Sequence, residues 1–263
     1  MKIPATVAVL TYNSGETLER ALKSVKNFGQ IIVCDGGSTD ETLDIAKKYN
    51  AEIVFQGKEF KNEDGSIADF SGIRNQCLEA ARHEWFLYVD SDEYIGDKLE
   101  SEIADVVDCN DRGVFWTPRR YVFNEQVAEC ATTYPSYQVR FFHTSLVSGF
   151  IKTIHERIHP KEGVEIRYLT EYMYVPVDLD FTKIFKKWRY YLDLEARRLH
   201  PLSFRLWFRK AVRESLIGVL YFLRLFKVHI VCRGKKLPIR LEMMRVWYQY
   251  ALVYSLLKTI KKW

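Results

Sequence analysis

The stretch that decides the fold is WFLYVDSDE, residues 85–93, in which five apolar or aromatic residues lead directly into three acids. Residues 85–89 have the composition of a strand that is buried on both faces. Asp90, Asp92 and Glu93 crowd the end of that strand, although two like charges about 4 Å apart repel by roughly 4 kcal/mol at an effective dielectric of about 20. A divalent cation would make this cluster tolerable, because hard oxygen ligands suit Mg²⁺ or Mn²⁺.

Strand and helix patterns alternate on the amino-terminal side of this stretch. Residues 15–27 place apolar side chains on one helical face, and Ser38 and Glu41 have the spacing of a capping box that would start a helix through Lys48. The expected strands are 5–13, 30–37 and 51–56, the expected third helix is 72–82, and 57–71 reads as a loop. Repeated strand–helix units predict an α/β fold with a mostly parallel sheet.

The pattern changes after about residue 112. Strand-like runs follow first, then a helix with Ile184, Trp188 and Tyr191 on one face, then two basic helices at about 202–227 and 239–262. We therefore predict a catalytic domain over 1–200, with a nucleotide-binding half at 1–95 and an acceptor half at 96–200. Residues 201–263 are predicted to form a helical, basic appendage.

The composition is that of a globular protein, with 48% hydrophobic and 28% charged residues. The five cysteines are scattered without a CxxC pair, so we expect neither a disulfide framework nor a zinc site. A reducing cytosol is then the simplest compartment. The amino terminus enters a strand pattern directly, and we expect no signal peptide.

Polar residues follow three of the expected strands, at 11–13, 35–40 and 90–93. In open α/β sheets, ligands bind beyond the carboxyl ends of the strands, so we expect these residues to line one crevice. Mg²⁺ typically keeps water ligands and binds one or two carboxylates together with substrate phosphates. The sequence therefore predicts a metal that holds a diphosphate at this edge.

Four blocks in this part of the chain resemble the successive motifs of glycosyltransferase family 2, which has the GT-A fold. They are VAVLTYNSGETLERALKSV, IIVCDGGSTDETLDIA, GIRNQCLEAA and WFLYVDSDE, and they span about residues 4–95. Each block is weak by itself, but the ordered set is specific. The resemblance implies an inverting enzyme that uses a UDP-sugar donor and Mg²⁺ or Mn²⁺.

The resemblance also implies roles for individual residues. Thr11, Tyr12 and Asn13 would line the nucleotide pocket, Asp35 would accept from the base N–H, Arg74 would face the donor phosphates, Asp90 the ribose, and Asp92 would ligate the metal. Three of these residues have a structural alternative. Asp35 would otherwise form a turn before Gly-Gly, Arg74 a surface ion pair, and Tyr12 part of the core.

The second half resembles, more loosely, bacterial lipopolysaccharide-core β-1,4-glucosyltransferases, through YPSYQVRFFHTSLVSGFIKTIHERI. This resemblance implies that His155 and Glu156 lie on the acceptor side. We favour Glu156 as the base that deprotonates the acceptor, with Glu93, Asp178 and Asp180 as alternatives. Glu156 would otherwise form a salt bridge with Arg157 or Arg140. His155 would be a third metal ligand or a hydrogen-bonded structural histidine.

The carboxyl-terminal region is strongly basic, with 16 Lys or Arg and two acids from residue 197 to 263. Apolar residues at four-residue spacing between 204 and 220 and between 243 and 257 form stripes, but no charge-free run reaches the roughly 20 residues that span a bilayer. We expect interfacial helices that hold the protein on anionic lipid at the cytoplasmic face of the membrane. The alternative is that the stripes pack on the catalytic domain or form a homo-oligomer.

Three other classes of protein share some of these features. A sugar nucleotidyltransferase usually carries a Gly-rich, basic loop after the first strand, which TYNSGETLERA lacks. A non-catalytic nucleotide-sugar binder or membrane scaffold differs from an enzyme in releasing no UDP. A nucleic-acid partner is not expected, because the basic residues of the tail alternate with long aliphatic residues. The predicted acceptor is a glycan or a lipid-linked glycan in bacterial cell-surface polysaccharide synthesis.

Overall fold

The computed structural model describes residues 2–63, 65–153, 156–199, 202–258 and 260. The chain forms two compact units. Unit 1 comprises residues 1–120 and 135–175, and unit 2 comprises residues 121–134 and 176–263. These boundaries differ from the division at residue 200 that we expected, because a central segment joins the carboxyl-terminal helices.

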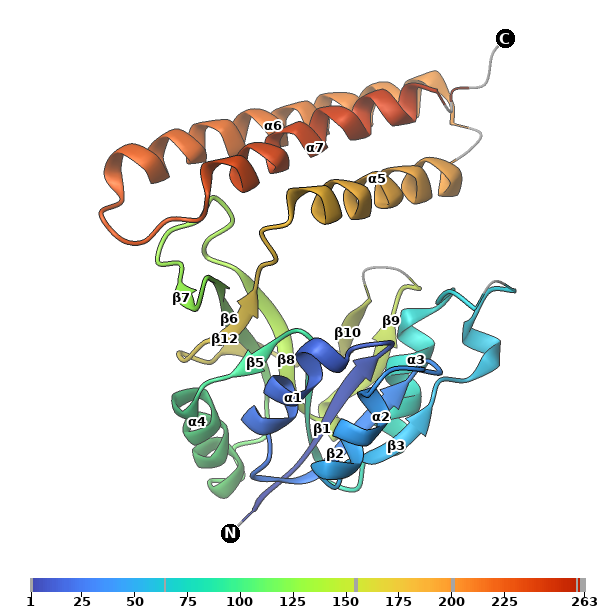
Figure 1. Ribbon diagram of the computed structural model, residues 1–263, viewed down its shortest axis with the longest axis vertical. Helices are drawn as coiled ribbons and strands as arrows, with labels where there is room; N and C mark the ends of the chain where they lie inside the picture. The colour runs from blue at the N-terminus through green and yellow to red at the C-terminus, as the bar shows by residue number, and fades with distance from the viewer. Residues whose placement is uncertain (1, 64, 154–155, 200–201, 259, 261–263) are drawn as a thin grey trace. The chain divides into compact units, whose positions relative to one another are not determined.

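Four parallel strands form the first half of the sheet in unit 1 (Figure 1). Their order is β3-β2-β1-β4, and the register sets Thr11 beside Asp35 and Leu10 beside Asp90. All four strands end at the same edge, as the strand–helix alternation predicts. The strands are β1 (Ile3–Thr11), β2 (Phe28–Asp35), β3 (Glu52–Phe55) and β4 (Trp85–Asp90).

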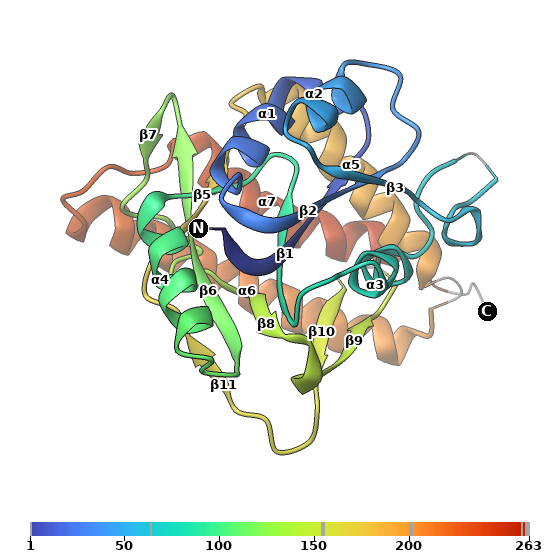
Figure 2. The ribbon, with the colours of Figure 1, turned by 90° about the horizontal axis from the view of Figure 1, so that it is seen from below.

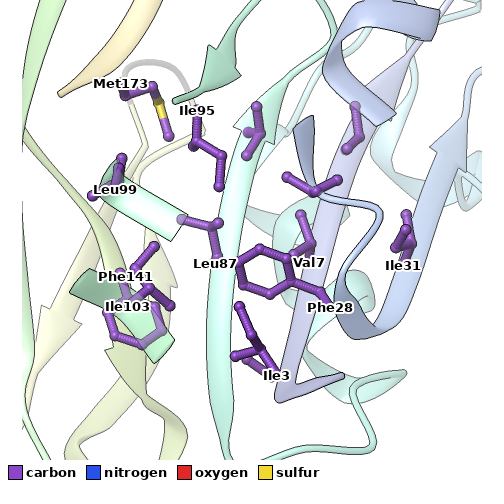
Figure 3. Close-up of a cluster of buried hydrophobic side chains, with 14 of the residues drawn as sticks. Ile3, Val7, Phe28, Ile31, Leu87, Ile95, Leu99, Ile103, Phe141 and Met173 are labelled. Carbon is purple, nitrogen blue, oxygen red and sulfur yellow. The ribbon is translucent and has the colours of Figure 1, made fainter. Parts of the chain in front are cut away.

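Helices cover both faces of these strands, because alternate residues of each strand point to opposite faces. Val7 packs with residues of α1 and α4, whereas Ala8 packs with residues of α3. Figure 2 shows α1 and α3 on opposite sides of β1, and Figure 3 shows the larger core between β1, β4 and α4. The helices are α1 (Gly15–Ser24), α2 (Thr42–Lys48), α3 (Phe70–Glu79) and α4 (Asp97–Asp108).

Antiparallel strands extend the sheet from β4 through β8 and β6. β12 and β5 continue it, β11 and β7 pair with β6, and β9 and β10 form a separate hairpin. The strands are β5 (Tyr94–Ile95), β6 (Val114–Phe123), β7 (Gln126–Val127), β8 (Tyr137–His143), β9 (Val147–Ile151), β10 (Arg157–Pro160), β11 (Ile166–Tyr168) and β12 (Met173–Pro176).

Unit 2 contains three helices, α5 (Phe181–Arg198), α6 (Phe204–Val231) and α7 (Ile239–Leu257). The segment 121–134 packs on them, since Ala128 and Ala131 share a buried cluster with Leu237 and Leu241. No helix in the described part of the chain is long and apolar enough to cross a bilayer.

Two sequence-based expectations about local structure are wrong. Cys130 forms a disulfide with Cys232, because segment 121–134 meets the loop between α6 and α7, where Cys130 N–H donates to Lys235 O at 3.0 Å. Ser38 does not cap α2, which begins at Thr42 without a side-chain cap. The Ser38 hydroxyl donates to Asp35 instead, at 2.5 Å.

Candidate functional site

Hydrogen bonds that involve side chains connect the ends of β1 and β2 and the segments that follow β1, β2 and β4. Thr11 Oγ1 donates to Asp35 Oδ2 at 2.9 Å, and Ser14 Oγ donates to Ser91 Oγ at 3.0 Å. Asn13 N–H donates to Ser38 Oγ at 2.8 Å. The three polar segments that the sequence singled out therefore lie at one edge of the sheet.

Asp35 braces the turn after β2. Its carboxylate is fully buried and accepts from the backbone N–H groups of Gly37 and Ser38, at 2.8 and 2.7 Å. The hydroxyls of Thr11 and Ser38 fill its other acceptor positions. The turn-forming role that we considered is thus present, and a hydrogen bond to a base would have to replace one of these four.

Tyr12 lies over this turn and is not part of the core, since 64% of its surface is exposed. A Cβ atom at Gly36 would come within 3.0 Å of the Tyr12 ring and 3.3 Å of the Thr11 carbonyl oxygen. Gly37 has a φ of +96°, which favours glycine. The Gly-Gly pair therefore lets the chain pass close beneath an exposed aromatic ring.

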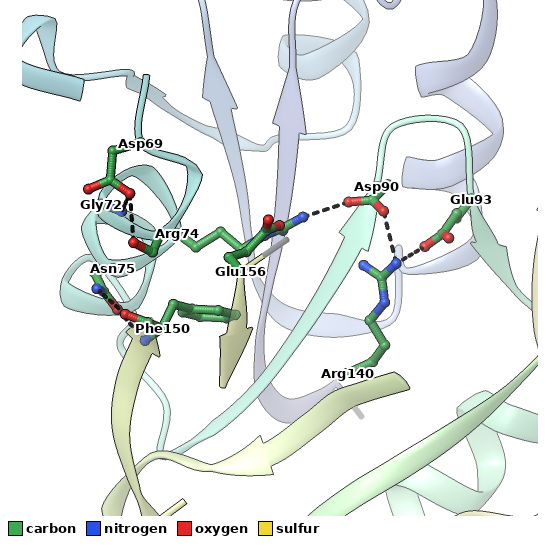
Figure 4. Close-up of polar contacts among 10 residues, drawn as sticks. Asp69, Gly72, Arg74, Asn75, Asp90, Glu93, Arg140, Phe150 and Glu156 are labelled. Carbon is green, nitrogen blue, oxygen red and sulfur yellow. Dashed lines mark hydrogen bonds and ion pairs between the residues drawn. The ribbon is translucent and has the colours of Figure 1, made fainter. Parts of the chain in front are cut away.

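Asp90 is held between two arginines from distant parts of the chain (Figure 4). Arg74 Nη2 on α3 donates to Asp90 Oδ1 at 2.8 Å, and Arg140 Nη2 on β8 donates to Asp90 Oδ2 at 2.8 Å. Both guanidinium groups also lie 4.4–4.5 Å from the centre of the Tyr88 ring. Arg74 is buried, so it is not the surface ion pair that we considered.

Burial and ion pairing shift the pKa values of the two neighbouring carboxylates, Asp90 and Glu93, in opposite directions. Burial would raise the pKa of Asp90, but Arg140 and Arg74 hold that pKa well below its usual range. Glu93 is only 3% exposed and lies 2.8 Å from Arg140 and 3.5 Å from Arg119. Burial nevertheless raises the pKa of Glu93 to about 7, because desolvation outweighs the attraction of Arg140.

Arg74 and Arg140 therefore balance the charge of Asp90, whereas burial favours the protonated form of Glu93. The sequence argument for a metal then rests on Asp92. Asp92 differs from them, because its side chain is exposed. No group of three His, Cys, Asp or Glu suited to a metal exists among the residues that the structure describes. His155, predicted as a metal ligand, lies outside those residues.

A cavity of about 670 Å³ opens beside the arginine–carboxylate network. Arg74, Asp90, Arg140 and Glu156 supply its charged wall. Its other lining residues come mainly from the antiparallel half of the sheet and include Trp116, Arg119, Tyr137, Gln138, Val139, Arg157, Ile158 and Ile166. Mixed aromatic and charged walls of this kind suit a polar ligand with flat apolar faces, such as a sugar.

Glu156 is the one of the four base candidates that lines this cavity. Its Oε1 accepts from Arg74 Nε at 2.6 Å, rather than from Arg157 or Arg140 as we had considered. Glu93 is buried behind the wall. Asp180 caps α5 by accepting from the N–H groups of Thr182 and Lys183, and Asp178 accepts from Asp180 N–H.

The sequence did not identify Trp116, Arg119 or Tyr88 as part of the site. Tyr88 and Asp90 are two residues apart on β4, so their side chains share a face, and this spacing is a usable signal. Trp116 and Arg119 have no such signal, because only the pairing of β6 with β8 brings them to the cavity.

Comparison with known proteins agrees with this geometry. The model of the family "Glycosyl transferase family 2" matches residues 6–155, which is more than half of the chain. The chain belongs to glycosyltransferase family 2. The parallel strands followed by antiparallel ones form the GT-A arrangement, so the predicted fold class is confirmed.

Individual relatives are similar over shorter stretches. The SPbeta prophage-derived glycosyltransferase SunS of Bacillus subtilis is 34% identical over 102 residues, 38% of this chain and 23% of SunS. The poly(ribitol-phosphate) β-N-acetylglucosaminyltransferase TarS of Staphylococcus aureus is 31% identical over 109 residues, 39% of this chain and 18% of TarS. The matches thus span less than a quarter of these relatives.

Solved structures of S. aureus TarS are similar over most of the chain at low identity. The crystal structure of S. aureus TarS 1–349 in complex with UDP-GlcNAc is 16% identical, with a TM-score of 0.49. The superposition covers 97% of this chain and 89% of that chain.

Proposed function

We propose that this protein transfers a sugar from a UDP-sugar to a hydroxyl of a glycan or lipid-linked glycan, with inversion at the anomeric carbon. The observation that carries the proposal is the position of Glu156. A carboxylate fixed by Arg74 lines a cavity that also includes Asp90, at the end of β4.

The donor side is assigned to the joined ends of β1 and β2. Tyr12 presents an exposed ring on which a uracil base would stack, next to Asn13 and the Asp35 turn. We assign Arg74, a buried cation, to the diphosphate, and Asp90, held by Arg74 and Arg140, to the ribose. These assignments are supported by the match of residues 6–155 to the family.

The chemical step needs a group that removes the acceptor proton as its oxygen attacks. Arg74 fixes Glu156 Oε1, so we assign Glu156 Oε2 to accept this proton. The bond between the anomeric carbon and the diphosphate breaks as the new C–O bond forms, and the proton remains on Glu156. Arg74 then holds the departing anionic group and the base in one geometry.

The residues present also fit a divalent cation bound with the donor. Asp92 carries an exposed carboxylate directly after the strand end, and one carboxylate together with diphosphate oxygens and water is a usual Mg²⁺ or Mn²⁺ ligand set. An ion bound there would supply positive charge that stabilises the leaving diphosphate. Asp90 is a poorer ligand, because an arginine occupies each of its oxygens.

The test is a screen of UDP-sugars by UDP release, with and without Mn²⁺, in the wild type, Glu156→Gln and Asp92→Asn. We expect Glu156→Gln to lose at least about a hundredfold in turnover while retaining UDP affinity, as general-base removal predicts. Asp92→Asn should lose the Mn²⁺-dependent part of UDP binding in calorimetry. Near-normal turnover of Glu156→Gln would remove this residue from the role of base.

The acceptor class follows from the cavity walls. Trp116 and Tyr137 are aromatic side chains that stack on sugar rings, and Gln138 and Arg157 offer hydrogen bonds to hydroxyl groups. We assign the acceptor to bacterial cell-surface polysaccharides, which is supported by the resemblance of residues 134–158 to enzymes of the lipopolysaccharide core. Transfer to purified core oligosaccharide, with wild type and Trp116→Ala compared, tests this assignment.

A further inference from the structure

Helix α6 carries an apolar stripe that faces solvent along most of its length. Its members recur every three or four residues, and each is between 45% and 65% exposed. They are Phe208, Val212, Leu216, Val219, Leu223, Phe226 and Ile230. At 1.5 Å per residue this α6 stripe is about 33 Å long.

The α6 stripe is not the face by which the helix packs inside unit 2. Gly218 and Leu225 are the buried residues of α6, and a Cβ atom at Gly218 would come within 3.0 Å of the Tyr250 ring on α7. Trp207 Nε1 on the same side donates to Val253 O at 3.2 Å. The packing face of α6 thus contacts α7, and the α6 stripe on the other side is exposed to solvent.

Basic side chains run along one edge of the α6 stripe. At 100° per residue, Arg209, Arg213, Arg224 and Lys227 fall beside it, and all four are exposed. Glu214 is the only acid in α6, and its side chain is 13% exposed on the packing side. An apolar face of this size with a basic margin differs from the scattered apolar residues of an ordinary surface.

We propose that α6 lies in the plane of an anionic lipid surface, with its stripe in the acyl boundary and its basic margin at the headgroups. Charge complementarity selects this occupant, because anionic lipid attracts Lys and Arg beside a membrane surface. A second copy of α6 would instead bring like charges together along the whole contact. The inference does not depend on the proposed enzyme activity.

The test is flotation of the full chain with vesicles made of equal parts phosphatidylglycerol and phosphatidylcholine, or of phosphatidylcholine alone. Arg209→Gln combined with Arg213→Gln should weaken binding to the anionic vesicles about 25-fold, at about fivefold per charge. Leu216→Ser combined with Leu223→Ser should weaken it about tenfold or more. Raising NaCl from about 0.1 to about 1 M should release the wild type, because the screening length falls from about 10 to about 3 Å.

Matched controls change similar residues elsewhere. Lys26→Gln with Lys98→Gln removes two exposed charges, and Phe55→Ser removes an apolar side chain that is 61% exposed. Both should float like the wild type, and circular dichroism checks that every variant is folded. Equal flotation of the α6 variants and the wild type overturns the proposal. A second result would also overturn it. In that result light scattering shows a wild-type dimer, the dimer does not bind vesicles, and the Leu216→Ser, Leu223→Ser variant is a monomer.

Discussion

Replacing Glu93 with glutamine tests whether burial or ion pairing dominates at the centre of the arginine network. Glu93 is 3% exposed and lies 2.8 Å from Arg140, yet burial raises its pKa to about 7 from the usual 4.5. A carboxyl group whose pKa is raised on folding binds more protons in the native state between these two values. Its contribution to stability is therefore fully present below pH 4.5 and is lost as the pH rises through 7.

The size of the effect follows from the two pKa values. A shift from 4.5 to about 7 corresponds to roughly 3 kcal/mol in the free energy of unfolding. Most of it develops between pH 5 and pH 8.5, where the wild type should lose about 2–3 kcal/mol relative to a variant that cannot ionise at this position. The difference in unfolding free energy, Glu93→Gln minus wild type, should rise by that amount.

The assay is urea unfolding of both proteins at several pH values from 5 to 8.5, followed by circular dichroism and fluorescence. Glu16→Gln changes an exposed carboxylate on α1 and serves as the control, with a difference that stays flat. A difference for Glu93→Gln that falls as the pH rises would refute the reasoning, because pairing with Arg140 would then outweigh burial.

Three further predictions concern the same scaffold. Arg140→Gln should lower the unfolding free energy by about 3 kcal/mol in urea, because one oxygen of Asp90 then has no cation and buried Glu93 keeps only Arg119, at 3.5 Å. Thr11→Val keeps the shape of the side chain but removes the 2.9 Å hydrogen bond to Asp35, so calorimetry should show weaker UDP binding by about 1–2 kcal/mol. Dithiothreitol should lower the stability of the wild type by about 2–4 kcal/mol in thermal unfolding but leave Cys130→Ser unchanged, since the disulfide closes a loop of about a hundred residues.

Local patterns in the sequence were sufficient for the parallel half of the sheet. Apolar runs that end in polar residues located β1, β2 and β4, and the rule that parallel strands share a carboxyl edge brought Thr11, Asp35 and Asp90 together. The α/β class and the edge that bears the site follow from these features. Helix α4 was not predicted, because residues 97–108 were not assigned to any element.

Such local patterns could not predict which side chains pair with Asp90. Its arginines lie 16 and 50 residues away along the chain, and only the packing of α3 and the pairing of β4 with β8 bring them to it. A metal was therefore the simplest neutralising charge from the sequence, whereas tertiary structure supplies Arg74 and Arg140. The same limitation hid the contact of Cys130 with Cys232, because no periodicity links segment 121–134 to the loop after α6.

Unit 2 is built from two separate parts of the chain, residues 121–134 and 176–263, which a ribosome synthesises at different times. Cys130 and Cys232 are 102 positions apart, so at roughly 5–20 residues per second about 5–20 s separate their appearance from a ribosome. Throughout that interval Ala128 and Ala131 lack the Leu237 and Leu241 side chains that later cover them. A nascent chain held at that stage would already contain the strands that carry Asp35 and Asp90. It would still expose apolar surface around Ala128 and Ala131 that chaperones could bind.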